Sequence, residues 1–61
     1  MPKFTVEFDM ENDAFARRPA TECARILRDV AVRLKSDAGM RERMILRDVN
    51  GNRIGSAGVE P

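Results

Sequence analysis

The sequence contains no histidine, tryptophan or tyrosine, and its only cysteine is Cys23. Histidine is the side chain most often used for general acid–base catalysis near neutral pH, so its absence argues against an enzyme. The usual zinc ligands, His and paired Cys, are missing, and a lone cysteine cannot form an internal disulfide. We therefore expect a protein that is not an enzyme and that holds no metal and no other cofactor.

With 61 residues, the chain is expected to form a single small α/β domain over residues 1–61. A domain of this size buries only about 60% of the surface of its unfolded chain, so its stability is marginal without further help. With disulfides and zinc missing, the remaining aids are self-association, as in a homodimer, or binding to a larger partner.

The N-terminal segment MPKFTVEFDM lacks the apolar core of a signal peptide, and no stretch approaches the length of a membrane span. A lone cysteine also suits a reducing compartment. These features predict a cytoplasmic protein with no membrane partner.

Apolar and polar residues alternate in KFTVEFD, residues 3–9, and this period of two predicts a strand with one buried face. Residues 10–18 show no sustained period and are expected to form a loop. Pro19 suits the first turn of a helix, where a missing N–H costs nothing. The apolar residues that follow have the spacing of an amphipathic helix of about four turns. They are Cys23, Ile26, Leu27, Val30, Ala31 and Leu34.

The glycines mark the later turns and strands. Gly39 is expected to end the helix as a left-handed cap. Two short strands, over residues 44–47 and 53–57, are expected to form a C-terminal hairpin. Gly55 and Gly58 weaken the second of these strands, which predicts that it lies at an edge of the sheet.

The predicted fold class is α+β, with one amphipathic helix packed on a small three-stranded sheet in the order β-α-β-β. The helix connects the first two strands. It makes them parallel if they share the sheet without a reversal of the chain.

The stretch RDVNGNRIG could be a metal loop or a turn, because its oxygen-bearing side chains alternate as calcium ligands do, at Asp48, Asn50 and Asn52. However, Arg53 stands where a calcium loop requires glycine, and Val59 stands where it requires a bidentate glutamate. The metal interpretation is therefore disfavoured.

The residues Asp48-Val49-Asn50-Gly51 instead suit a type I turn, with Gly51 as the left-handed bulge residue of a three-residue hairpin loop. In this register Leu46 lies opposite Ile54, which forms an apolar cross-strand pair. A two-residue Asn50-Gly51 turn would place Leu46 opposite Gly55 instead.

One candidate binding surface lies on the predicted helix and consists of Arg25, Arg28, Val32 and Lys35. Cations on a solvent-facing line can bind phosphates or an acidic protein surface. The alternative is that the ion pairs Glu22–Arg25 and Asp29–Arg33 simply decorate a solvated face. Glu22 also suits the positive end of the helix dipole.

A second candidate surface is acidic, and its residues are spaced by two along the first strand and the loop after it. Glu7 and Asp9 share the exposed face of the predicted strand, and Glu11 and Asp13 continue the row. Such a row can mimic nucleic-acid phosphates or bind an arginine-rich partner. The alternative is a solubilising strand face.

Three segments, KFTVEFD, ARILRDVAVRL and LRDVNGNRIG, together resemble small accessory proteins of bacteriophages and prophages. The resemblance covers nearly the whole chain and rests on the core pattern and the turn. Arg18 departs from it, because an acidic or hydroxyl helix cap would be expected there. The stretch Met40-Arg41-Glu42-Arg43 is also additional. No catalytic residues of such a family exist to carry over.

The resemblance implies a phage protein that acts stoichiometrically on host machinery. Many phage proteins of this size inhibit host defence, including anti-CRISPR proteins, by covering a site on a larger protein complex. The expected function is therefore non-enzymatic inhibition of a host defence complex, such as a CRISPR effector, through protein–protein contact. The alternatives are a nucleic-acid-binding or regulatory protein that uses the helix arginines, and a phage structural or assembly component.

Overall fold

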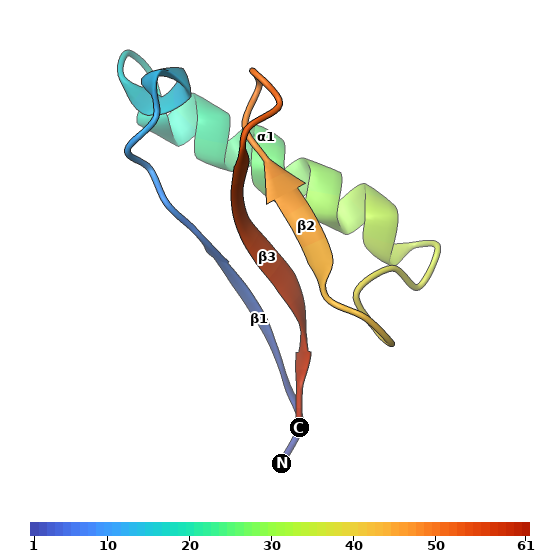
Figure 1. Cartoon of the computed structure of the whole chain (residues 1–61). Helices are drawn as coiled ribbons and strands as arrows, with labels where there is room; N and C mark the ends of the chain where they lie inside the picture. The colour runs from blue at the N-terminus through green and yellow to red at the C-terminus, as the bar shows by residue number, and fades with distance from the viewer.

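The computed structural model describes residues 1–61. In chain order, its elements are β1 (Lys3–Phe8), the 3-10 helix η1 (Asp13–Phe15), α1 (Pro19–Leu34), β2 (Met44–Arg47) and β3 (Arg53–Glu60). The strands form one three-stranded sheet in the order β1-β3-β2, and α1 crosses one face of this sheet (Figure 1). The predicted α+β class, with one helix on a three-stranded sheet and a C-terminal hairpin, is confirmed.

The last strand is the central one, so its predicted edge position was wrong. β3 pairs antiparallel with both β1 and β2, which makes β1 and β2 parallel to each other, as the connecting helix predicted. Gly55 lies opposite Phe8, and a Cβ atom at Gly55 would lie 2.6 Å from the Cα of Phe8. Glycine in this strand therefore marks a close approach of two backbones rather than a sheet edge.

The hairpin turn forms as predicted. Gly51 has a φ of 84°, its N–H donates to the carbonyl of Asp48 at 3.0 Å, and the N–H of Asp48 donates to Asn52 at 2.9 Å. The predicted pairing of Leu46 with Ile54 was wrong, because the register shifts between Leu46 and Arg47 and places Leu46 opposite Gly55. The bulge allows both Leu46 and Ile54 to be buried.

The two ends of α1 follow local rules only in part. Pro19 occupies the first turn as predicted, and Arg18 at the N-cap makes no side-chain capping hydrogen bond. Gly39 has the expected positive φ, but it lies beyond the C-cap residue Lys35. Its carbonyl instead accepts a hydrogen bond from the N–H of Val59, so Gly39 joins the loop after α1 to the sheet.

The apolar core lies between α1 and the sheet and is closed at one end by η1. It consists of Phe15, Ile26, Val30, Met44, Leu46, Ile54 and Ala57. Of the predicted helix stripe, Cys23 and Leu34 are partly buried and pack against this core, whereas Leu27 is 50% exposed and Ala31 is also exposed. The sheet under α1 has only three short strands, so it covers a narrower stripe than the apolar pattern offers.

Candidate interaction surfaces

Two arginines of α1 bind the outer edge of β2. An Nη2 group of Arg25 donates to the carbonyl of Arg47 at 3.1 Å, and Nη2 of Arg33 donates to the carbonyl of Ile45 at 2.8 Å. In an antiparallel ladder, alternate residues direct their backbone groups to opposite sides of the strand. Ile45 and Arg47 are alternate residues whose carbonyls face away from β3, so the helix provides donors to the outward carbonyls of this edge.

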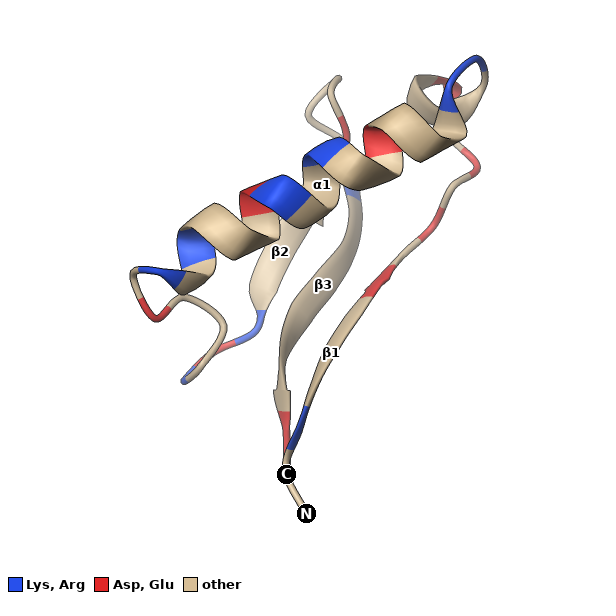
Figure 2. Ribbon diagram, turned by 180° about the vertical axis from the view of Figure 1, so that it is seen from behind, with Lys and Arg blue, Asp and Glu red and all other residues tan.

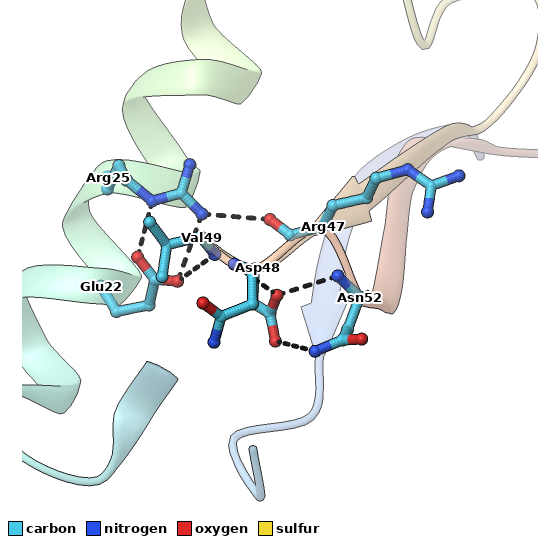
Figure 3. A network of polar contacts seen from close by, with 7 residues as sticks. Glu22, Arg25, Arg47, Asp48, Val49 and Asn52 are labelled. Atoms are coloured by element: carbon cyan, nitrogen blue, oxygen red, sulfur yellow. Dashed lines mark hydrogen bonds and ion pairs between the residues drawn. The ribbon is translucent and has the colours of Figure 1, made fainter. Parts of the chain in front are cut away.

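Glu22 is a buried carboxylate that joins α1 to the hairpin turn (Figure 3). Its Oε1 accepts a hydrogen bond from Nε of Arg25 at 2.6 Å, and its Oε2 accepts from the N–H of Val49 at 2.9 Å. The hydrogen bond from Arg25 lowers the pKa of Glu22, and the bond from Val49 adds to this, while burial opposes it. The same contact with Glu22 raises the pKa of Arg25.

Asp48, the first residue of the turn, accepts hydrogen bonds on both carboxylate oxygens. Oδ1 accepts from the backbone N–H groups of Asn50 and Asn52, each at 2.9 Å. Oδ2 accepts from the side-chain amides of Asn12 at 2.9 Å and Asn52 at 3.2 Å. Burial alone would raise the pKa of Asp48, but the hydrogen bonds from Asn52, Asn12 and Asn50 outweigh it and lower the pKa.

These contacts support the turn interpretation of RDVNGNRIG over the metal interpretation. The carboxylate of Asp48 is directed at N–H donors, and Asn52 turns its amide N–H rather than its carbonyl oxygen toward it. The structure contains no group of three or more His, Cys, Asp or Glu side chains that could hold a metal ion.

We expect the protein to lose stability on acidification because of Glu22 and Asp48. The pKa of each is lower in the folded chain than its ordinary value, so each contributes stability that is fully present above the ordinary pKa. That contribution is lost as the pH falls below about 4 toward the folded-state pKa values. Urea unfolding between pH 7 and pH 2.5 should show this decline in the free energy of unfolding. The decline should be smaller in Glu22→Gln, which has no carboxylate at this position. A free energy of unfolding that is constant over this range would contradict it.

The candidate helix surface divides into tied and free side chains. Arg25 is tied to Glu22 and to β2, and the pair of Arg33 with Asp29 also forms at 3.1 Å, as the alternative interpretation predicted. Arg28, Val32 and Lys35 lie together on the exposed face of α1, where Val32 is 63% exposed. Neither Arg28 nor Lys35 lies in an ion pair.

The acidic residues form a continuous row that we call the acidic strip (Glu7, Asp9, Glu11 and Asp13). Figure 2 shows it along β1 and the segment that leads to η1. All four residues are exposed, and none lies in an ion pair. A shallow depression of about 410 Å³ lies beside Glu7 and Asp9, where the strand meets Ile54, Gly55 and Ser56 of β3. The strip is therefore accessible and none of its carboxylates is taken up in an ion pair.

Arg43 crosses the face of the sheet opposite α1, a role that its sequence context does not indicate. Its Nε donates to Oγ of Ser56 at 3.1 Å, and Nη2 donates to Oγ1 of Thr5 at 3.1 Å. The aliphatic part of Arg43 covers Gly58, where an added Cβ would lie 3.0 Å from the Cγ of Arg43. Arg43 therefore stabilises the sheet by joining β1 and β3 on this face.

The chain matches no family model, no curated protein and no solved structure in the three comparisons made. None of the helices has both the length and the apolar character needed to cross a membrane. Arguments about function therefore depend on the two surfaces themselves.

Proposed function

We propose that this chain is a non-enzymatic, phage-type binding protein that inhibits a larger host defence complex, such as a CRISPR effector, by stoichiometric contact. The acidic strip would make the contact by covering a basic site on that complex. The observation that supports this proposal is that Glu7 on β1 and Asp9 just after it are both exposed and that neither lies in an ion pair. Charges arranged in this way accelerate and orient association with a surface of opposite sign.

The spacing of the strip suits a basic nucleic-acid-binding groove. Side chains two residues apart on a strand lie on the same face, about 6.7 Å apart along the chain. Glu7 and Asp9 are such a pair. A regular row of negative charges of this kind can occupy the place of a phosphate backbone, which would block the groove without any chemical reaction.

The helix surface is the weaker candidate. Arg25 and Arg33, which face β2, already donate to carbonyls of that strand. Arg28 and Lys35 therefore remain as the free cations around Val32. Two cations without an aromatic side chain beside them offer little for nucleic acid, whose affinity grows with the number of phosphate contacts.

The test is capture of bound material from host lysate by tagged protein, with and without nuclease, followed by mass spectrometry. We expect one defined multi-subunit complex in both samples, from the wild type and from Arg28→Glu. The Glu7→Lys/Asp9→Lys double variant should lose it, with affinity lowered by about 100-fold or more, because like charges would now face each other. Both variants should unfold at the wild-type temperature, since these side chains are exposed.

Other results would reject parts of this proposal. Loss of the complex from Arg28→Glu but not from Glu7→Lys/Asp9→Lys would place the contact on α1. Loss of all material after nuclease treatment would instead make the chain a nucleic-acid-binding protein, and a strong decrease of affinity with salt would accompany that result.

A further inference from the structure

The outer edge of β1 carries unpaired backbone groups. The N–H of Asp9 donates to the carbonyl of Ile54 at 2.9 Å, so the backbone of Asp9 faces β3. Because backbone direction alternates along a strand, Phe4, Val6 and Phe8 direct their N–H and C=O groups away from the sheet. A row of this kind is a template for another strand.

The edge at β1 is the free edge of the sheet, because the edge at β2 is occupied. At β2, side chains of α1 already donate to the outward carbonyls of Ile45 and Arg47. No side chain of the protein donates a hydrogen bond to the outward carbonyls of β1. α1 does not cover the whole of β1, because the N-terminal end of this strand extends beyond the helix (Figure 2).

Apolar side chains accompany the free edge. Phe4 is 37% exposed on β1, Met10 is 49% exposed just after it, and Leu27 is half-exposed on α1. Leu27 lies on the side of α1 that faces β1, because Cys23, one turn earlier, contacts Met10 with 3.8 Å between the sulfur atoms. The opposite side of α1 carries the arginines that reach β2. The chain thus leaves its apolar surface uncovered beside the edge that is unpaired.

We propose that β1 pairs antiparallel with β1 of a second copy of this chain, about a two-fold axis at Val6. Val6 then lies opposite Val6 of the second copy, and Phe4 lies opposite Phe8 of the second copy. Each of these pairs consists of residues whose backbone groups face outward, so each can exchange two hydrogen bonds. The two sheets become one continuous sheet with both helices on the same face, and the closed interface is isologous.

The side chains favour this pairing. Lys3 lies opposite Asp9 of the second copy, which places opposite charges side by side at both ends of the paired strands. Phe4 and Phe8 form cross-strand aromatic pairs on the face that carries α1. Thr5 lies opposite Glu7 of the second copy on the other face, where Glu7 remains open to solvent and to the partner proposed above.

The neighbouring registers are worse. An axis at Glu7 places the two Glu7 carboxylates directly opposite each other, and like charges at this position are destabilising. An axis at Thr5 places Phe8 opposite Pro2, which has no N–H to donate. Other axes shorten the paired segment or set outward backbone groups against inward ones. The register at Val6 alone uses all three outward residues.

The first test is the mass of the chain alone, measured by sedimentation as a function of concentration, for the wild type and for proline variants. We expect a dimer with twice the 6.9 kDa mass of one chain at micromolar concentrations. Val6→Pro should raise the dimer dissociation constant by 100-fold or more, because it removes the N–H at the axis and no hydrogen bond within the chain. Ile45→Pro at the outer edge of β2 is the matched control and should leave dimerisation unchanged.

A second test does not depend on whether the proline variants fold. In a Cys23→Ala background, Val6→Cys should form a disulfide-linked dimer on oxidation, because the two Cα atoms would lie about 5.5 Å apart. Phe4→Cys should not crosslink, because in this register the two residues at position 4 lie four residue positions apart along the paired strands. A mass of one chain up to millimolar concentration, a dimer that persists in Val6→Pro, or crosslinking through Phe4→Cys rather than Val6→Cys would each overturn the proposal.

Discussion

Replacing Gly55 with alanine is expected to unfold most of the protein. The added Cβ would lie 2.6 Å from Cα and 2.8 Å from Cβ of Phe8, in the strand paired with it. Real Cβ atoms do not approach backbone this closely, so β1 and β3 would have to separate at this position. Overpacking in a well-packed region costs about 1–3 kcal/mol and sometimes more, and here the obstacle is backbone that cannot rotate away.

The size of the domain makes this cost decisive. Proteins gain roughly 0.05–0.15 kcal/mol of stability per residue, so a chain of this length has a few kcal/mol to lose. We expect Gly55→Ala to lower the free energy of unfolding by about 3 kcal/mol or more, measured by urea denaturation with circular dichroism. Most molecules would then be unfolded or partly unfolded at 37 °C.

Gly51→Ala is the matched control. Its φ of 84° is unfavourable for alanine, but an added Cβ would meet nothing within 4 Å. The expected cost is therefore only the conformational one, about 1–2 kcal/mol. If Gly55→Ala and Gly51→Ala were equally stable, the close approach of β1 and β3, and with it the central position of β3, would be contradicted.

The contrast between these two glycines also explains which parts of the fold were predictable from sequence. Gly51 belongs to a turn whose chemistry lies within four consecutive residues, and the turn formed as expected. The role of Gly55 depends on which strand lies beside it, and no local pattern contains that information. Glycine in a strand predicts an edge position, whereas here Gly55 permits the close approach of Phe8 at the centre of the sheet.

The apolar helix pattern predicted the helix but overestimated its buried stripe. Ile26 and Val30 are buried as expected, but Leu27 and Ala31 lie toward β1, where one copy of the chain provides no cover. The apolar pattern of a helix reflects all the surfaces that the helix contacts, including those of partners. The core of a single chain accounts for only some of these apolar residues. The exposed Leu27 is thus consistent with the proposed dimer, in which a second copy lies beside this part of the surface.

Three arginines act as braces in a domain without disulfides. Arg25 and Arg33 reach from α1 to carbonyls of β2, and Arg43, the residue before β2, reaches across the sheet to Thr5 on β1. Each carries a long aliphatic part that covers apolar surface and a planar head that donates several hydrogen bonds. Arginine is abundant in the sequence, but which arginines are tied and which are free depends on tertiary contacts. The candidate surfaces were for this reason only partly predictable.

Glu22 shows the same limit, and it provides the second large expected effect. Its position near the start of α1 predicted only a favourable contact with the helix dipole. In the structure it is 6% exposed and accepts hydrogen bonds from Arg25 and from the N–H of Val49, and the latter lies 27 residues away in the sequence. The contact with Val49 fixes the hairpin turn against the helix.

Replacing Glu22 with alanine is therefore expected to lower the free energy of unfolding by about 2–3 kcal/mol. The variant leaves the N–H of Val49 without its partner and Arg25 without its counter-ion. Arg25 is 43% exposed in its side chain, so water partly solvates it, and the loss stays below that of a fully buried pair. Asp29→Ala, which breaks the exposed pair with Arg33, is the control and should cost no more than about 0.5 kcal/mol.

A double-mutant cycle separates the two contacts of Glu22. If the ion pair dominates, Glu22→Ala and Arg25→Ala will show a coupling energy of about 1 kcal/mol or more, and the double variant will be little worse than Glu22→Ala. If the hydrogen bond from Val49 dominates, the two losses will add. In either case the hairpin should become more mobile in Glu22→Ala, with faster amide exchange at Val49 than in Asp29→Ala, because the buried carboxylate joins the turn to α1. Unchanged exchange at Val49 would show that the turn keeps its place without the helix, held by Asp48 and its own hydrogen bonds.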